Sequence, residues 1–158
     1  LSLLEKARVL ATMNVAIADA VICCWHAKYT YAFWRPVTAI PLADTDSNDA
    51  TLADASWTPL LTTPNHPEYP SGHSSQSGAA SAVLAAFFGA DNEFILTSET
   101  TPGVTRAFTS LSAAAYEAAD ARVFGGIHFR SACVDAQAMG RQVASYVLEN
   151  AMHRIHGR

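Results

Sequence analysis

The stretch that decides the fold reads PSGHSSQSGAASAVLAAFFGA and runs from Pro70 to Ala90. It opens with a turn of proline, serine and glycine, and it continues with small and apolar residues at the three- and four-residue spacing of a helix. Gly89 is a typical helix stop. We therefore expect a helix from His73 or Ser74 to Gly89, whose many alanine and serine residues favour close packing against other helices.

Helical spacing recurs on both sides of this stretch. Ser2 can cap a first helix together with Glu5, Pro102 is typical of a helix start, and the pair Gly125-Gly126 is typical of a helix end. The three further helices that we expect span residues 3–28, 104–124 and 128–152. No segment shows the alternation expected of strands, so we predict an all-α protein, a helical bundle of four to five main helices.

Residues 29–72 form the one long connection in this bundle. They carry six of the seven prolines, together with the polar run Asp44–Asp49, and this composition favours turns over regular elements. A loop of this length is usually functional. We therefore expect a long Pro-rich active-site loop between the first two helices.

The bulk composition excludes several classes of partner. A chain of 158 residues with a formal charge of −4 fits a single domain, 1–158, and offers neither a nucleic-acid groove nor a polybasic membrane anchor. The longest small-apolar run, Ala79–Ala90, is shorter than the roughly 20 residues of a membrane-spanning helix. We expect a soluble protein without a membrane span, in a compartment that the sequence does not reveal. Cys23, Cys24 and Cys133 favour free thiols over a disulfide framework.

Two cationic side chains flank the start of the loop. Lys28 and Arg35 stand seven residues apart, and Pro36 disfavours helical geometry at Arg35, so the lysine belongs to a helix end and the arginine to the loop. Both can reach one anion, Lys28 as a point charge and Arg35 as a planar fork of donors. The simpler alternative is that both are solvated groups near a helix end.

The turn before the second helix is a candidate anion site. Gly72 lets the backbone approach a ligand closely, and the helix that follows points free N–H groups outward. Ser71 can add a hydroxyl donor, and His73 is placed to act as general acid or base. The alternative is an ordinary Ser/His helix cap.

The third candidate stretch contains Arg122 and His128. Six residues apart, they would lie on different faces of a continuous helix, but a break at Gly125-Gly126 would let both side chains point toward one place. A lone histidine in an apolar stretch is more often a core residue. The co-occurrence of three such stretches favours a shared oxyanion pocket instead.

These three blocks, Lys28-x6-Arg35-Pro36, Pro70-Ser71-Gly72-His73 and Arg122-x5-His128, resemble the signature of the type 2 phosphatidic acid phosphatase and vanadium-dependent haloperoxidase superfamily. The flanking segments 33–40 and 66–70 are more similar to its soluble bacterial haloperoxidase-like branch than to the membrane lipid phosphatases. Membership of this branch is compatible with a secreted or periplasmic protein of a bacterium.

The resemblance implies a helical bundle whose pocket holds vanadate or phosphate, ions of one shape. His128 would coordinate vanadium or attack phosphorus, and His73 would be its acid–base partner. The residues that would bind the oxygens are Lys28, Arg35, Ser71, Gly72 and Arg122.

Three functions fit this resemblance. The first is a vanadium-dependent haloperoxidase that binds vanadate and oxidises halide with hydrogen peroxide. The second is an acid-phosphatase-like hydrolase that cleaves a phosphate ester through a phosphohistidine at His128, and the third is a phosphate-binding helical domain without catalysis. Haloperoxidases of this superfamily are commonly larger than this chain. The resemblance therefore implies the site-bearing part of a larger chain or assembly, and we expect a homo-oligomer.

Two positions depart from the family pattern. The phosphatase pattern usually has Ser before the arginine of the third block and Asp four residues after its histidine, where this chain has Ala121 and Ala132. Asp135 lies about 10 Å further along a helix, too far to orient His128 directly. Either another group or a backbone carbonyl fixes the ring, or His128 is a poorer nucleophile than is usual in the family. This favours vanadate ligation or weak phosphatase activity.

Four further residues lie near the blocks. His66 and Glu68 are candidate proton relays at the pocket rim, with solvated loop residues as the alternative. Phe33 and Trp34 are candidate pocket walls that exclude water and so strengthen its electrostatics, with ordinary core residues as the alternative.

Overall fold

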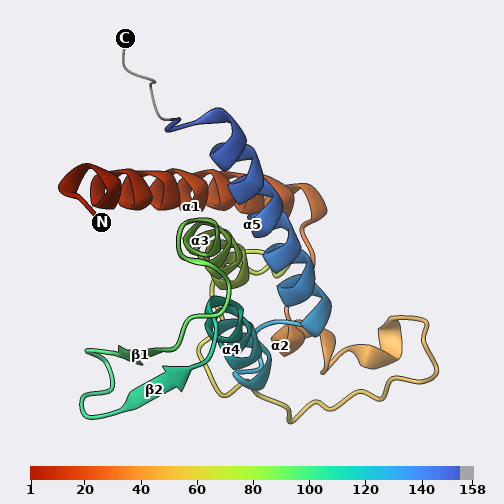
Figure 1. The fold of residues 1–158 in the computed structure, drawn as a ribbon. Helices are drawn as coiled ribbons and strands as arrows, with labels where there is room; N and C mark the ends of the chain where they lie inside the picture. The colour runs from red at the N-terminus through yellow and green to blue at the C-terminus, as the bar shows by residue number, and fades with distance from the viewer. Residues whose placement is uncertain (154–158) are drawn as a thin grey trace.

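Four long helices carry the fold, in agreement with the predicted all-α bundle (Figure 1). The computed structural model describes residues 1–153. The long helices are α1 (Leu3–Tyr31), α3 (Gly72–Phe88), α4 (Leu111–Phe124) and α5 (Arg130–Asn150). The short elements are α2 (Pro36–Ala39), the 3-10 helix η1 (Ala43–Thr45), β1 (Phe94–Thr97) and β2 (Thr105–Phe108).

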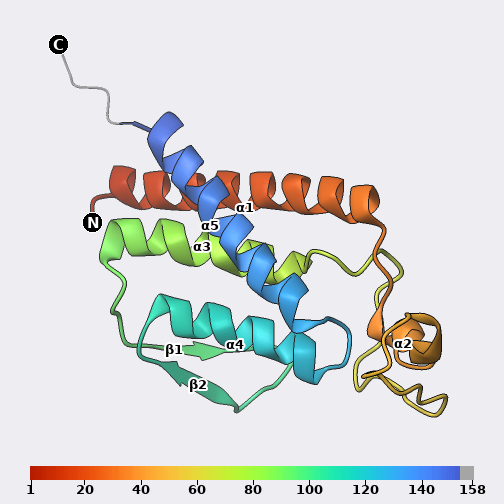
Figure 2. The same cartoon turned by 90° about the vertical axis from the view of Figure 1, so that its right-hand side faces the viewer.

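Helix α3 is the central element. It packs on α1, α4 and α5, and Figure 2 shows α1, α3 and α4 stacked in layers with α5 crossing them. Small and β-branched side chains fill the centre, since bulky ones would hold these helices apart. The buried core of α1, α3 and α5 consists of Ala16, Ala20, Ala79, Val83, Ala144 and Val147.

The backbones of α3 and α5 touch at two glycines. A Cβ atom on Gly78 would lie 2.7 Å from the carbonyl oxygen of Gln137, and one on Gly140 would overlap the carbonyl oxygen of Ser75. Neither partner atom can move without shifting a helix, because both belong to the backbone. The close packing expected of a helix rich in small residues is therefore confirmed.

Replacing Gly140 with alanine should destabilise the fold by about 3 kcal/mol, the upper end of the usual cost of overpacking, because the added methyl group meets backbone atoms. Urea unfolding followed by circular dichroism measures the change. Gln142→Ala, an exposed change on the same helix, is the control and should stay within about 0.5 kcal/mol of the natural protein. Equal stability of the two variants would show that α3 and α5 do not approach this closely.

A β-hairpin replaces the first part of the third predicted helix. The expected helix over 104–124 is wrong at its start, since Thr105–Phe108 form β2, which pairs antiparallel with β1. Gly103 has a φ of +82°, a left-handed turn conformation that no helix accommodates, and the rings of Phe94 and Phe108 contact each other across the strands. Alternation over four residues is too short a pattern to separate a strand from an adjoining helix.

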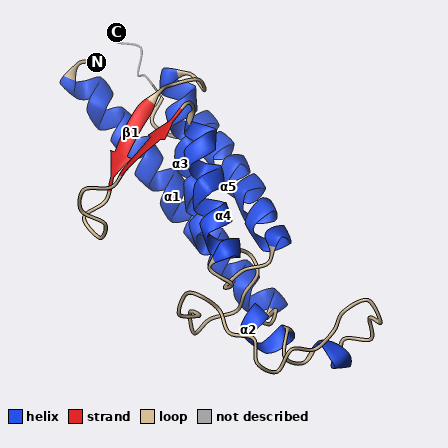
Figure 3. Ribbon diagram, turned by 90° about the horizontal axis from the view of Figure 1, so that it is seen from below, coloured by secondary structure: helices blue, strands red, loops and turns tan. Residues whose placement is uncertain are grey.

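The Pro-rich loop and the hairpin lie at opposite ends of the bundle (Figure 3). The backbone N–H of Leu61 donates to the carbonyl oxygen of Gly125 (3.0 Å), and that of Glu68 donates to the carbonyl oxygen of Phe33 (3.0 Å). The loop therefore covers the end of the bundle where α1 ends, α3 begins and α4 turns into α5.

One described segment is long and apolar enough to cross a bilayer, by length and composition alone. It spans Leu3–Ala39, with a mean hydropathy of 1.6 over its most apolar window and 28% of that window buried. Core helices of soluble proteins and signal sequences pass the same test. In the fold this segment contains α1, which packs on α3 and α5. The expectation of no membrane span, drawn from Ala79–Ala90, stays a prediction.

Candidate oxyanion-binding site

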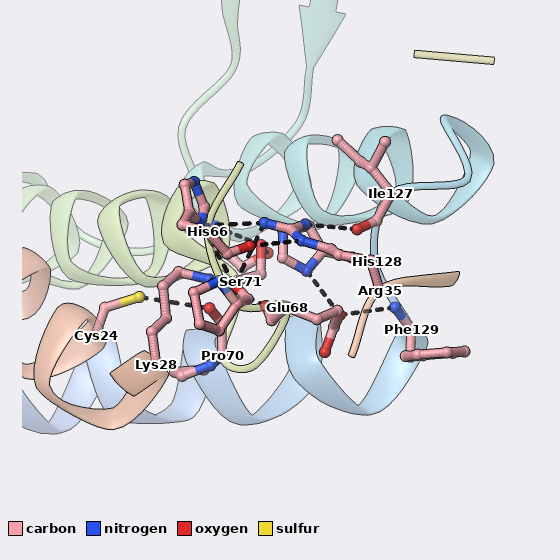
Figure 4. A network of polar contacts seen from close by, with 12 residues as sticks. Cys24, Lys28, Arg35, His66, Glu68, Pro70, Ser71, Ile127, His128 and Phe129 are labelled. Carbon is pink, nitrogen blue, oxygen red and sulfur yellow. Dashed lines mark hydrogen bonds and ion pairs between the residues drawn. The ribbon is translucent and has the colours of Figure 1, made fainter. Parts of the chain in front are cut away.

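The three predicted blocks meet at the loop end of the bundle (Figure 4). Lys28 lies in the last turn of α1, Ser71 caps α3, and His128 lies in the turn between α4 and α5. Arg35 caps the one-turn helix α2, because Pro36 fixes the first helical position. Arg35 and His128, 93 residues apart in sequence, are in direct hydrogen-bond contact.

Lys28 is completely buried, and the loop binds its ammonium group. Its Nζ donates hydrogen bonds to the carbonyl oxygens of Pro67 (2.8 Å) and Glu68 (3.0 Å). Burial lowers the pKa of Lys28 to about 8, because the charged form loses its water. An ammonium group has three donors, so one remains for a ligand after these two carbonyls are satisfied.

Every nitrogen of the buried Arg35 guanidinium contacts a protein group. Nε donates to the carbonyl oxygen of His66 (3.1 Å), Nη2 to that of Pro67 (3.3 Å), and Nη1 to that of Ile127 (2.6 Å). Nη1 also lies 3.1 Å from Nε2 of His128. The guanidinium therefore joins the loop to the turn after α4, and it stands beside the His128 nitrogen at which a ligand would bind.

His128 is held between Arg35 and a buried carboxylate. Oε1 of Glu68 lies 2.7 Å from Nδ1 of His128 and accepts a second hydrogen bond from the backbone N–H of Phe129 (2.9 Å). Glu68 is 1% exposed and His128 is 5% exposed. Burial lowers the pKa of His128, while the hydrogen bond to Glu68 opposes this shift. The prediction of Glu68 as a rim or solvated residue is therefore wrong.

The turn before α3 offers free donors. The backbone N–H of Ser71 is used, because it donates to the carbonyl oxygen of Ala132 (3.0 Å), while the Ser71 hydroxyl accepts from Ser74 and is hydrogen-bonded to the thiol of Cys133. Within the described residues, the backbone N–H groups of Gly72 and His73 have no hydrogen-bond partner, as is usual at a helix start. These are the groups that a helix N-terminus presents to an anion.

The helix break at Gly125-Gly126 is present, as predicted. Helix α4 ends at Phe124, Gly126 has a left-handed φ of +71°, and α5 begins two residues after His128. Arg122 lies in the last turn of α4, and its Nε is buried without a hydrogen-bond partner among the residues that the structure describes. A buried donor of this kind is costly unless a ligand satisfies it.

His73 lies at the start of α3 and is accessible to solvent. Partial burial lowers its pKa, and the charges of Arg122 and His66 act in the same direction. His73 is therefore within electrostatic range of Arg122 and His66. An accessible, neutral imidazole beside a cation can take up and release protons near neutral pH.

Trp25, one turn before Lys28 on α1, lies against the turn before α3, a contact that the sequence did not predict. Its ring would lie 3.2 Å from a Cβ on Gly72, and its centroid is 5.2 Å from that of His66. The available signal was the three-residue spacing to Lys28, which places both side chains on one helix face. Phe33, which we predicted as a wall, is 48% exposed.

Asp135 does not belong to this cluster. Its carboxylate accepts a hydrogen bond from the hydroxyl of Tyr69 (3.0 Å) at the surface. Asp135 therefore does not orient His128, and the sequence spacing had already predicted that it lies too far away. A cavity of about 700 Å³ between the ends of α1 and α5 also lies apart, since none of the predicted site residues lines it.

The cluster has the donor set of a tetrahedral oxyanion site. Among residues 1–153, no three His, Cys, Asp or Glu side chains are grouped as ligands for a bare metal ion. Nε2 of His128 instead lies 3.1 Å from Nη1 of Arg35, and Nε of Arg122 has no hydrogen-bond partner within residues 1–153. Vanadate fits these groups, because its oxygens accept hydrogen bonds and its metal can accept one nitrogen ligand.

Comparison with known proteins decides the family. The chain matches the family described as the VCPO second helical-bundle domain over residues 8–157, nearly its whole length. The chain belongs to this family. A curated relative is the vanadium chloroperoxidase of Curvularia inaequalis, which is 30% identical over 94 residues, or 53% of this chain and 15% of the relative. The predicted membership of the haloperoxidase superfamily is thereby confirmed.

Solved structures of this family have the same fold. A structure described as the first bacterial vanadium-dependent iodoperoxidase has a TM-score of 0.79 at 41% identity, covering 89% of this chain and 32% of that chain. An apo-type bacterial vanadium-dependent chloroperoxidase has a TM-score of 0.72 at 25% identity, covering 87% and 35%. The chain thus spans about a third of the length of these solved relatives.

Proposed function

We propose that this chain carries the vanadate site of a vanadium-dependent haloperoxidase, an enzyme that oxidises halide with hydrogen peroxide. The observation that carries the proposal is Nε2 of His128 in contact with the buried cation Arg35, together with the buried Nε of Arg122, which has no hydrogen-bond partner among the described residues. The relatives support it, since they include a vanadium chloroperoxidase and a vanadium-dependent iodoperoxidase. These two names differ in halide, so they leave the halide of this chain open.

Each residue of the cluster then has a defined task. The residues that we propose to bind the vanadate oxygens are Lys28, Arg35, Ser71, Gly72 and Arg122. Nε2 of His128 would ligate vanadium, and bound vanadate supplies a Lewis-acid centre that makes hydrogen peroxide electrophilic. Nη1 of Arg35 must release Nε2 of His128 when the ligand enters, because it now lies 3.1 Å from that nitrogen.

His73 has the position of a proton donor and acceptor for this reaction. Halide and hydrogen peroxide give hypohalous acid and water, and one proton is consumed. Because His73 is accessible to solvent and lies near Arg122, it can carry this proton from bulk water into the site.

Two assays test the proposed function. With vanadate and hydrogen peroxide, the protein should oxidise iodide or bromide and halogenate a phenolic dye, and excess phosphate should suppress this activity by competing for the site. Hydrolysis of an aryl phosphate without halide oxidation would support the phosphatase alternative, since the same donors fit phosphate. Anion binding without turnover in either assay would support the non-catalytic alternative.

Affinity for a tetrahedral anion should fall above pH 8. Lys28 loses its proton around this pH, and only its charged form attracts an anion, so the dissociation constant should rise by up to about tenfold per pH unit. Burial lowers the pKa values of His66, His73 and His128, so these rings stay neutral throughout this range. Calorimetric titration with sulfate, whose charge is constant here, measures the effect.

Two lysine variants control this experiment. Lys28→Met should bind sulfate weakly and without the loss of affinity above pH 8. Lys6→Met, an exposed change on α1, should keep the profile of the natural protein. A sulfate affinity that stays constant from pH 7 to pH 9 in the natural protein would contradict a role for the Lys28 charge.

A further inference from the structure

We propose that Glu68 is the positioning residue of His128, and that its carboxylate keeps the ring proton on Nδ1 and leaves Nε2 free for the ligand. The identity of that ligand rests on the proposed function, whereas the position of the ring proton can be tested without vanadate. The phosphatase pattern described above usually has an aspartate for this task, four residues after the histidine. This chain has Ala132 there, so the ring needs another partner.

The two partners of His128 specify a single tautomer. Arginine carries only N–H donors, so Nε2 must accept the hydrogen bond from Nη1 of Arg35 at 3.1 Å. A carboxylate accepts, so the proton of the neutral ring lies on Nδ1 and is donated to Oε1 of Glu68 at 2.7 Å. The two contacts are independent of each other, and both assign the proton to the same nitrogen. The lone pair of Nε2 is thus directed toward Nη1 of Arg35.

Glu68 is itself fixed by the segments around it. Its Oε1 also accepts from the backbone N–H of Phe129, its own N–H donates to the carbonyl oxygen of Phe33, and its carbonyl oxygen accepts from Nζ of Lys28. The side chain is 1% exposed. A carboxylate held in this way leaves the imidazole one orientation, which is what a partner behind a ligating histidine provides.

The position of the missing aspartate is used for a different contact. Ala132 is buried, and its carbonyl oxygen accepts from the backbone N–H of Ser71, which docks the turn before α3 onto α5. Asp135, the next acidic residue along α5, is bound to Tyr69. The partner of His128 therefore lies on the loop, two positions before Pro70, and not on α5.

Nitrogen-15 NMR of the histidine rings tests the tautomer in the vanadate-free protein. The signals of His128, assigned by their loss in His128→Ala, should show a protonated Nδ1 and an unprotonated Nε2. Glu68→Gln keeps an acceptor oxygen and should preserve this pattern, whereas Glu68→Ala should increase the share of the Nε2-protonated form. Asp135→Asn, a change of a carboxylate outside the cluster, is the matched control and should leave the signals unchanged.

Vanadate affinity, measured by vanadium-51 NMR, reports the consequence for binding. Loss of the partner behind a ligating histidine usually weakens metal affinity by about 10- to 100-fold, and we expect this for Glu68→Ala. Glu68→Gln should lose less than about tenfold, because it keeps the hydrogen bond to Nδ1. Asp135→Asn should bind as the natural protein does. The glutamine variant keeps the shape of the buried side chain, so it stays informative if the alanine variant does not fold.

The outcomes separate this proposal from the proposed function. A natural protein that has the proton on Nδ1 but binds no vanadate would overturn the proposed function and support the role of Glu68. A natural protein with the proton on Nε2 would overturn the role of Glu68. So would a folded Glu68→Ala variant whose His128 signals and vanadate affinity match those of Asp135→Asn.

Discussion

Replacing His128 with alanine should lower vanadate-dependent halide oxidation by at least about a thousandfold, in the range seen when a group central to catalysis is removed. The substitution deletes the nitrogen that we propose as the vanadium ligand, while Lys28 and Arg122 remain to attract the anion. Vanadate should therefore still bind weakly but without turnover. Initial rates of iodide oxidation at a series of vanadate concentrations separate these two effects.

A second histidine provides the control for this experiment. His26 is an exposed histidine on α1, and His26→Ala should retain the natural rate. Removing His128 leaves the buried Glu68 one hydrogen-bond partner short, so a loss of about 1–3 kcal/mol in the free energy of unfolding is also expected. A folded His128→Ala variant that keeps the natural rate would contradict the proposed ligand.

The largest effect on stability is expected at Arg35. Arg35→Met should lower the free energy of unfolding by at least about 3 kcal/mol, since each hydrogen bond from a charged group contributes about 1.5–3 kcal/mol. Methionine fills much of the space but removes this donor from the buried carbonyl oxygen of Ile127 and from the half-buried carbonyl oxygens of His66 and Pro67. Guanidinium chloride unfolding, followed by tryptophan fluorescence, measures the loss.

The chain offers two useful comparisons for Arg35→Met. Arg35→Lys should recover only part of the stability, because an ammonium group lacks the planar fork that reaches several carbonyls at once. Arg141→Met, an exposed change on α5, should stay within about 0.5 kcal/mol of the natural protein. If Arg35→Met and Arg141→Met unfolded at the same denaturant concentration, the guanidinium would not hold the loop to the bundle.

The fold class could be predicted because its signals are local. Each long helix shows helical spacing over many residues, and the ends carry recognisable residues, such as the Ser2 and Glu5 capping box and the Gly125-Gly126 break. The hairpin was missed because each of its strands has four residues. Its pairing depends on a turn at Gly103 whose conformation cannot be distinguished, in sequence, from the approach to a helix.

Only those site residues that belong to short sequence motifs could be predicted. Residue types at fixed spacing located Lys28, Ser71 and Arg122 within three blocks that the structure brings to one end of the bundle. The contact between Glu68 and His128 joins residues 60 positions apart, and it depends on how the loop folds back on α1. No local pattern carries that information. The partners of Arg35 could not be predicted either. We expected its N–H groups to bind an anion, but in the fold they donate to carbonyl oxygens of the loop.

The central claim is that this cluster binds a tetrahedral oxyanion with Nε2 of His128 at the metal. A crystal of the protein soaked in orthovanadate, with anomalous diffraction recorded at the vanadium absorption edge, tests it most directly. We expect one vanadium peak at bonding distance from Nε2 of His128, with the vanadate oxygens in contact with Lys28 and Arg122. A vanadium peak elsewhere, or an undisturbed contact between Arg35 and His128 at saturating vanadate, would contradict it.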